Sequence, residues 1–281
     1  MVKSVIKNIV NILLMLLLTL LLFIFGIFVV VNANCTNADF YIQLMDKAQK
    51  NNGFYDKIFE DAEKIFEYRG TLSALPEEVF DGILTKDYII QSSREYVRAV
   101  VDGNLDEFTL HELRQTVFDR IHVYLLANPS NITEGEIESF CDFLDGEMIQ
   151  ATKLPFFAKI YPSIDTMFKS GIRVLVPVTA TVLLAAIIMG LYFLSDRKSV
   201  ITIRNIAISV LGCVLMTGII SGFLWLLDSS VFFNFSTDVV LYYLDELKKY
   251  LALGITCLTG LYFIFGICLI WVTYKKKGKL K

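Results

Sequence analysis

The chain has 281 residues, of which 55% are hydrophobic, and a formal net charge of −3. Ordinary soluble domains are about 45–50% apolar, so this composition argues against a wholly soluble protein. The weak net charge and the lack of a basic stripe also argue against a nucleic-acid-binding protein. The apolar excess must therefore be located along the chain before any function is considered.

Four segments hold that excess, and none of them contains Asp, Glu, Lys, Arg or His. A bilayer core is crossed by about 20 consecutive apolar residues in a helix, so each segment predicts a transmembrane helix. The segments are residues 9–31, 174–194, 205–227 and 250–274.

The first segment has a second interpretation as a cleaved signal peptide, because Lys3 and Lys7 precede it. Its apolar run of 23 residues exceeds the roughly 7–15 residues of a signal peptide, which favours an uncleaved anchor. A lipoprotein site at Cys35 fits less well, since Asn32-Ala33-Asn34 is a poor match to the small apolar residues expected there.

The distribution of basic residues predicts the orientation, because cytoplasmic loops are enriched in Lys and Arg. With the N-terminus inside, residues 1–8, 195–204 and 275–281 face the cytoplasm and hold ten basic residues in 25 positions. The remaining sixteen lie in the 164 residues of the two outer segments, 32–173 and 228–249. We therefore predict a multi-pass protein of the cell membrane with both termini in the cytoplasm.

Residues 32–169 predict an acidic, helical extracytoplasmic domain inserted between the first and second transmembrane helices. They hold 24 acidic and 13 basic residues, a net charge of −11. Apolar residues recur every three or four positions, which is the spacing of one helix face. The four stripes are Tyr55, Ile58, Ala62, Ile65 and Phe66; Ile90, Val97 and Val101; Leu110, Leu113, Val117, Ile121 and Tyr124; and Ile137, Phe140, Cys141, Leu144 and Met148.

The predicted fold is an all-α membrane protein in three parts. Residues 1–31 form the cytoplasmic N-terminus and first transmembrane helix, 32–169 the helical domain, and 170–281 transmembrane helices two to four with a basic tail. Within the domain, the pairs Thr109/Glu112 and Thr133/Glu136 fit a capping box at a helix start.

Glycines at 53, 70, 82 and 103 are expected to end or separate helices of the domain. The outer segment 228–249 carries a short amphipathic stripe that includes Val239 and Tyr243, with Asp238, Asp245 and Glu246 opposite. It is expected either to cap the helical domain or to lie on the bilayer surface.

Five cysteines divide into two groups. Cys213, Cys257 and Cys268 lie in predicted transmembrane helices, where they are expected to pack as small apolar residues. Cys35 and Cys141 lie in the predicted outer domain, where a disulfide can persist. A bridge between these two is one expectation, and two separate thiols are the alternative.

Residues for catalysis or metal binding are sparse. The two histidines, His111 and His122, are eleven positions apart on one predicted helix, three turns from each other and too far to share a metal ion. The sequence has no HExxH, CxxC or GxSxG motif and no phosphate-binding glycine loop. We expect a protein that is not an enzyme and needs no cofactor or metal.

Small residues recur on the predicted transmembrane helices and allow helix backbones to approach closely. Gly218 and Gly222 form a GxxxG step on the third helix, and Ala186 and Gly190 form a similar step on the second. These residues are expected to pack within the four-helix bundle, with homo-oligomer or partner contact as the alternative.

Three segments carry a resemblance to uncharacterised four-helix membrane proteins of Gram-positive bacteria. They are Phe54-Tyr55-Asp56-Lys57-Ile58, Leu75-Pro76-Glu77-Glu78-Val79-Phe80-Asp81 and the region around Tyr96. The resemblance implies the same topology and a helical extracytoplasmic domain, and it brings no known activity.

Together these features predict an integral envelope protein in the lipid bilayer, acting as a non-enzymatic interaction or scaffold protein. Its outer domain is expected to bind a membrane or extracellular protein. The alternative is a subunit of a channel, permease or transporter complex, since four helices are few for a carrier that acts alone.

Overall fold

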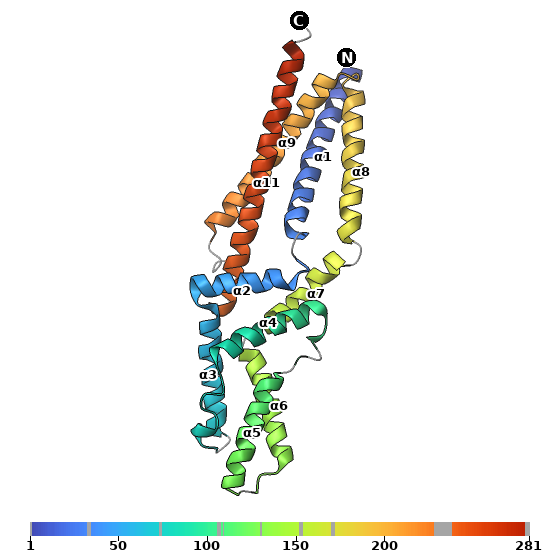
Figure 1. Cartoon of the computed structure of the whole chain (residues 1–281). Helices are drawn as coiled ribbons and strands as arrows, with labels where there is room; N and C mark the ends of the chain where they lie inside the picture. The colour runs from blue at the N-terminus through green and yellow to red at the C-terminus, as the bar shows by residue number, and fades with distance from the viewer. Residues whose placement is uncertain are drawn as a thin grey trace. The chain divides into compact units, whose positions relative to one another are not determined.

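The computed structural model describes residues 2–32, 35–72, 75–105, 108, 110–129, 131–151, 154–169, 172–227 and 238–278. Over these residues the chain forms ten α-helices and one short 3₁₀ helix, with no strand (Figure 1). The all-helical prediction is thus confirmed. The helices form two compact units, the membrane unit (1–35, 167–228 and 247–281) and the helical domain (36–166 and 229–246).

Four helices are long and apolar enough to cross a membrane, which confirms the number of predicted spans. They are α1 (Val2–Asn32), α8 (Ile172–Leu194), α9 (Ser199–Leu226) and α11 (Asp238–Gly278). All four begin earlier than the predicted apolar segments do. Helix α1 begins at Val2 rather than 9, α8 at Ile172 rather than 174, α9 at Ser199 rather than 205 and α11 at Asp238 rather than 250. Each helix extends into the polar residues beside its apolar segment because the backbone hydrogen bonds that form a helix do not depend on hydropathy.

Helix α1 contacts each of the other three membrane helices. Leu18 is buried with Ile187 and Leu191 of α8, and Figure 1 shows α1 beside both α8 and α9. The Tyr262 hydroxyl of α11 donates a hydrogen bond to the Leu22 carbonyl at 2.8 Å. Helix α1 is therefore the packing centre of the membrane unit.

In the turn between α8 and α9, two residues other than glycine have a left-handed backbone conformation. Asp196 (φ 53°) and Arg197 (φ 60°) follow α8, and the Arg197 amide donates to the Tyr192 carbonyl, as in a Schellman motif. The Lys7 ammonium of α1 pairs with the Asp196 carboxylate at 2.5 Å and lowers the pKa of that carboxyl. The start of α1 and the α8–α9 turn therefore lie at the same end of the membrane unit.

The helical domain consists of six helices, the 3₁₀ turn and the first turns of α11. In chain order they are α2 (Ala38–Asn52), α3 (Phe54–Leu72), η1 (Glu77–Val79), α4 (Lys86–Asp102), α5 (His111–Ala127), α6 (Glu134–Ala151) and α7 (Pro155–Lys169).

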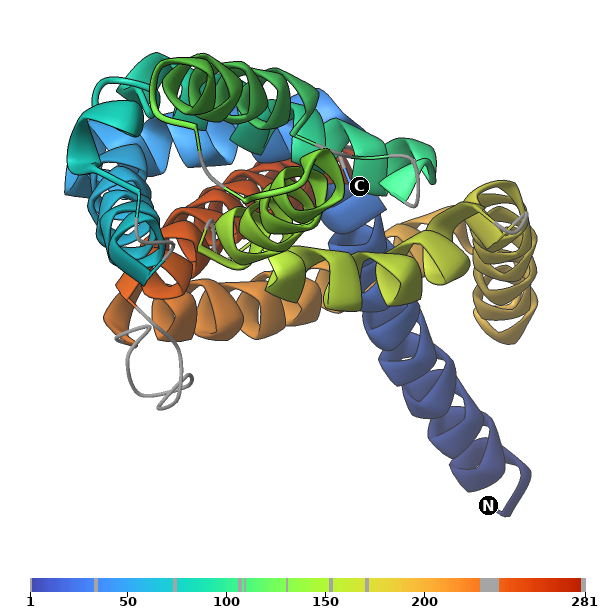
Figure 2. The same cartoon turned by 90° about the horizontal axis from the view of Figure 1, so that it is seen from below.

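Gly53 (φ 69°) and Gly103 (φ 79°) end α2 and α4 in the left-handed conformation, as expected of C-terminal glycines. The chain changes direction sharply between α2 and α3 (Figures 1 and 2). The prediction for Gly70 is wrong, because this residue lies in the last turns of α3, where the surrounding helix tolerates it.

Most residues of the predicted apolar stripes lie in the core of this domain. Ile65, Ile90 and Tyr124 are exceptions and are only half-buried, and in α4 the neighbouring Ile89 is buried in place of Ile90. Tyr55, Ile58, Ala62 and Phe66 of α3 are all buried, as are Val117 and Ile121 of α5. Phe54 is also fully buried, although its position at the first residue of α3 hid it from the periodicity. Aromatic rings join the helices, with Phe66 edge-on to Phe80 at 5.6 Å and Phe80 6.1 Å from Phe140 of α6.

The first turns of α11 belong to the helical domain. Val239 and Tyr243 are buried, and the Tyr243 ring lies 6.4 Å from Phe54. This arrangement is the cap predicted for the second outer segment. Glu246 was expected on the polar face but is only 5% exposed, where it accepts a hydrogen bond from the Asn51 amide of α2 at 2.8 Å.

One of the two predicted capping boxes is confirmed. Glu136 accepts hydrogen bonds from the backbone amide and the hydroxyl of Thr133 at 2.7 and 2.8 Å, and its own amide donates to the Thr133 hydroxyl. These bonds hold the pKa of Glu136 below its usual value. The Thr109 half of the other box lies outside the described residues.

Candidate interaction site

Helices α5 and α6 pack side by side and carry the most prominent surface features of the helical domain. Leu113, Val117 and Ile121 of α5 are buried against α6. The facing stripe on α6 is the predicted one, except that Phe140 lies at its edge and is half-buried. The buried residues of this stripe on α6 are Ile137, Cys141, Leu144 and Met148.

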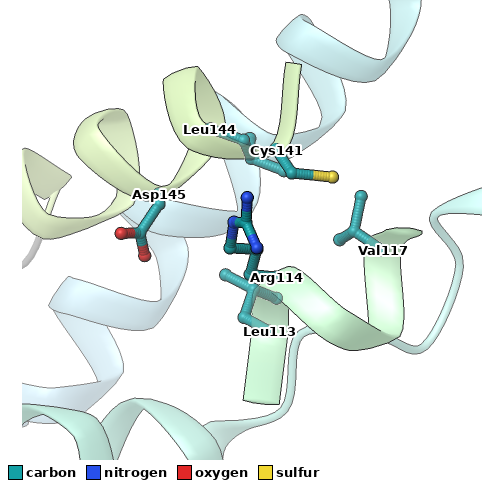
Figure 3. A pocket seen from close by; sticks show the side chains of 6 residues that line it. All are labelled: Leu113, Arg114, Val117, Cys141, Leu144 and Asp145. Carbon is teal, nitrogen blue, oxygen red and sulfur yellow. The ribbon is translucent and has the colours of Figure 1, made fainter. Parts of the chain in front are cut away.

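Cys141 sits in a hollow between the two helices, with its sulfur pointing from α6 toward Val117 of α5 (Figure 3). Arg114 reaches toward α6 in the same view, and its Nε lies 2.9 Å from Asp142 Oδ1. Burial raises the pKa of the Cys141 thiol to about 11 despite this nearby guanidinium. A thiol of that pKa carries almost no thiolate near neutral pH, as is typical of a cysteine that packs in a core.

Asp145 closes the other end of this hollow (Figure 3). One of its oxygens accepts a hydrogen bond from the Leu110 amide at 2.9 Å, which satisfies a free backbone donor at the start of α5. Partial burial raises the pKa of the Asp145 carboxyl, although this bond and Arg114 act in the opposite sense. The Asp145 carboxylate thus links the start of α5 to α6.

A second depression, here called the hairpin cleft, opens beside the α5–α6 pair. It has a volume of about 240 Å³. Five of its six lining residues are apolar, and Glu136 is the sixth. The lining residues are Leu75, Ile121, Ile132, Glu136, Ile137 and Phe140.

Exposed apolar side chains occur both on the hairpin cleft and on α5. Ile132, which lines the cleft, is 41% exposed. Val123 and Leu126 on the last turns of α5 are 66% and 71% exposed, and the helix period puts both on the face of α5 turned away from Ile121. Single exposed apolar residues are ordinary, so the partly exposed apolar wall of the cleft is the feature typical of a protein-binding surface.

A cluster of polar side chains joins α2, α3 and α4. Asp46 accepts a hydrogen bond from the Tyr55 hydroxyl at 3.1 Å and pairs with the Arg94 guanidinium at 2.8 Å. Burial and the Asp46 carboxylate raise the pKa of Tyr55. Tyr55 is only 1% exposed, so these polar contacts stabilise the packing of the three helices against one another.

Cys35 and Cys141 are both thiols in the structure, and a disulfide between them stays a prediction. The Cys35 thiol donates to the Val31 carbonyl at 2.6 Å, at the end of α1. Cys213 is buried as expected of a packing residue, whereas Cys257 and Cys268 are exposed on α11.

The predicted packing glycines differ in their surroundings. A Cβ on Gly190 would lie 3.2 Å from Leu14 of α1, and one on Gly218 would lie 3.8 Å from Thr259 of α11. For Gly222 no described atom lies within 4 Å of that position, and Ala186 is exposed. Among the described glycines of the membrane unit, a built Cβ comes closest to a neighbouring side chain at Gly26, 2.7 Å from Leu258, and at Gly254, 2.6 Å from Val30.

A row of small polar residues along α9 is the feature that sequence reasoning missed. It is buried, and the available signal was its spacing of three, four or eight residues, which keeps the row on one face of the helix. The row consists of Thr202, Asn205, Ser209, Thr217 and Ser221.

The row bonds to neighbouring helices. The Ser209 hydroxyl donates to the Met15 carbonyl of α1, the Asn205 amide donates to Asn11 of α1, and Ser221 lies 2.6 Å from the Thr256 hydroxyl of α11.

No group of three or more His, Cys, Asp or Glu side chains with metal-binding geometry occurs among the described residues. His111 and His122 both lie on α5 as predicted. No protein-family model, no curated protein and no solved structure matches this chain. The functional argument therefore rests on the geometry alone.

Proposed function

We propose that this is a multi-pass protein of the cell membrane that acts as a non-enzymatic interaction or scaffold protein through an extracytoplasmic helical domain. In this proposal both termini are cytoplasmic. The membrane unit anchors the protein in the bilayer, and the helical domain binds a membrane or extracellular protein. The hairpin cleft, with exposed Ile132 on its wall, is the observation that carries the proposal.

The distribution of charge supports the proposed orientation. The segments assigned to the cytoplasm carry ten of the 26 basic residues in only 25 positions. The Lys7–Asp196 pair supports the placing of the N-terminus and the α8–α9 turn on one and the same side of the membrane.

The orientation is tested by thiol labelling of intact cells with a membrane-impermeant maleimide. The native cysteines are replaced by alanine, and a single cysteine is introduced at exposed Leu126 or at Asp196. Labelling of Leu126→Cys alone supports the proposal. Labelling of Asp196→Cys alone would reverse the topology.

The interaction role is tested by photo-crosslinking in intact cells. A photoreactive amino acid is placed at Ile132 of the hairpin cleft, with Ile160 of α7 as the matched control, since Ile160 is also exposed (51%). One discrete protein adduct from position 132, absent at position 160, is expected. Equal adducts at both positions, or none at either, would count against a binding role for this surface.

A subunit of a channel, permease or transporter complex is the second candidate, favoured by a groove between α9 and α11. The groove has a volume of about 450 Å³ and is lined by Val214, Gly218, Ser221, Thr256, Thr259, Gly260 and Phe263. A Cβ on Gly260 would meet no described atom within 4 Å. Such an unfilled face of small residues is suited to close approach by another transmembrane helix.

This candidate requires assembly, because the described part of the chain has four helices that could span a membrane, which are few for a carrier. Native mass measurement in nanodiscs gives the number of chains, and ion flux into liposomes gives the transport activity. A monomer without ion flux would show that this chain does not form a channel by itself. A defined oligomer with ion flux would contradict the scaffold proposal.

A further inference from the structure

Three basic side chains lie together where α8 passes into α9. Arg197 and Lys198 belong to the turn between the two helices, and Arg204 lies on the second turn of α9. All three are exposed, and they are called the basic turn here. No carboxylate in the described part of the chain forms an ion pair with any of them.

The acid closest to the basic turn in the sequence is already bound. Asp196 pairs with Lys7 of α1, so it does not neutralise the three cations. Asp196 is also the only Asp or Glu in residues 1–31, 170–227 and 247–281. The positive charge of the basic turn is therefore left for a partner from outside the chain.

The local structure directs the three cations toward one region. The left-handed backbone of Arg197 (φ 60°) turns the chain, and its guanidinium carbon lies 5.7 Å from the centre of the exposed Phe193 ring. Lys198 directly precedes the first residue of α9. Arg204 lies five residues after Ser199, or about 7.5 Å along the axis, and helical side chains lean toward the N-terminus of their helix. The first turn of α9 contains no acid, so the positive end of its dipole adds to these charges.

An apolar face of α9 continues from Arg204 in the other direction. Ile208, Leu215 and Ile219 follow at intervals of four, seven and four residues, which keeps them on the same helix face as Arg204. They are 50%, 69% and 71% exposed. Because α9 is long and apolar enough to cross a membrane, this face meets acyl chains when the helix lies in a bilayer.

From this combination we propose that the basic turn binds the headgroup of an anionic phospholipid. Arg197, Lys198 and Arg204 contact the phosphate oxygens, and the acyl chains lie along the apolar face of α9. A phospholipid fits better than a free anion, because only an amphiphile also covers the apolar face below the cations. The inference does not depend on the interaction role proposed for the helical domain.

The test measures lipid binding to the full chain by native mass spectrometry from detergent micelles. Phosphatidylglycerol and phosphatidylcholine with identical acyl chains are added in equal amounts, so that only the headgroup charge differs. We expect the unsubstituted protein to retain phosphatidylglycerol at least about tenfold more strongly than phosphatidylcholine.

Two variants with the same loss of charge separate a site from general attraction. The turn variant carries Arg197→Gln, Lys198→Gln and Arg204→Gln. The tail variant carries Lys275→Gln, Lys276→Gln and Lys277→Gln, at the end of α11. Binding at the basic turn predicts that the turn variant loses the preference for phosphatidylglycerol and that the tail variant keeps it. General attraction predicts the same partial loss in both.

A single substitution keeps the test informative if the turn variant does not fold. Arg204→Gln changes one exposed side chain and should weaken phosphatidylglycerol binding about fivefold, whereas Lys276→Gln should leave it unchanged. Unchanged thermal unfolding of both variants verifies the fold.

Glycerol 3-phosphate, which carries the phosphate without acyl chains, distinguishes a lipid from a free anion. It should not displace phosphatidylglycerol when the two are present at equal concentration. Displacement under that condition would show a free-anion site and overturn the lipid assignment. Equal loss in the turn and tail variants, or no headgroup preference in the unsubstituted protein, would overturn the inference as a whole.

Discussion

The helices within the membrane unit and those within the helical domain are held together by different kinds of contact. In the membrane unit the helices are joined by hydroxyl and amide groups, such as Asn205 and Ser209, and by glycines that let backbones approach. In the helical domain the same role falls to buried apolar and aromatic side chains, such as Ile58 and Phe66. Polar residues thus face inward in one unit and mainly outward in the other.

The surrounding solvent explains this inversion. In water, burial of apolar surface is the dominant favourable term, so an apolar stripe is sufficient to pack a helix. In lipid, an apolar side chain gains little by leaving the hydrocarbon, and association depends on close packing and interhelical hydrogen bonds. The comparison predicts that equivalent substitutions will have different effects in the two units.

The largest effect is expected in the helical core. Ile58→Ala removes a side chain with no exposed surface and should cost about 2–5 kcal/mol of unfolding free energy. Val123→Ala, at a position 66% exposed, is the control and should change the stability little. Pulse proteolysis of the full chain in urea measures both. A loss below about 0.5 kcal/mol for Ile58→Ala would show that this core is not tightly packed.

The next effect is expected at a glycine of the membrane unit. Gly254→Val places a side chain where Val30 is 2.6 Å from the Cβ position, and overpacking of this kind costs about 1–3 kcal/mol. Gly260→Val on the same helix meets no described atom within 4 Å and serves as the control. Thermal unfolding in detergent compares the two variants. Equal destabilisation would contradict the packing of α1 against α11.

Removal of the confirmed capping box should have a smaller effect. Thr133→Ala should cost about 1 kcal/mol, because the free amides at the start of α6 lose their partner. The variant should also change the pH dependence of stability. The pKa of Glu136 is lowered in the folded state, so its contribution is present above its unfolded value of 4.5 and is lost as the pH falls through the lower folded value.

Urea unfolding at several pH values between 3 and 7 measures this contribution. The slope of stability against pH in the acid range should be shallower in Thr133→Ala than in the unsubstituted protein. Thr133→Ser keeps the hydroxyl and is the matched control. A Ser variant as unstable as the Ala variant would show that the hydroxyl is not the stabilising group.

The smallest effect is expected for one bond of the polar row. The Asn205 amide and Asn11 Oδ1 are 3.2 Å apart between α9 and α1. Hydrogen bonds between transmembrane helices average about 0.6 kcal/mol in double-mutant cycles. A cycle of Asn11→Val, Asn205→Val and the double variant should give a coupling of that size. Strict additivity of the two substitutions would mean that the bond does not contribute to stability.

The comparison also shows where sequence reasoning succeeded. Uncharged apolar segments identify spanning helices because a bilayer requires a minimum apolar length, and four were found at the expected places. The stripes of α3 and α5 predicted buried residues because water separates the two faces of a helix. The same rule failed for Glu246, whose burial depends on Asn51 of α2, far away in the sequence.

The hairpin cleft was beyond prediction for a related reason. Leu75, Ile121 and Ile132 each read as ordinary residues of a loop or a helix, and only folding brings them together around one space. The close contacts of glycines could not be predicted either. GxxxG spacing marks a helix face that permits close approach, but it does not show which helix approaches. Gly222 fits the motif and has no described neighbour, whereas Gly254 fits no motif and nearly touches Val30.

By itself the sequence determined the helical class, the four spanning segments, the acidic character of residues 32–169 and the buried stripes of that region. These properties follow from composition and period, which act locally along the chain. Only the tertiary structure decided the central place of α1, the polar row of α9 as a bonded seam and the cleft beside α6. Each of these depends on which surfaces meet, because a contact between two helices is set by the shapes and polar groups of both.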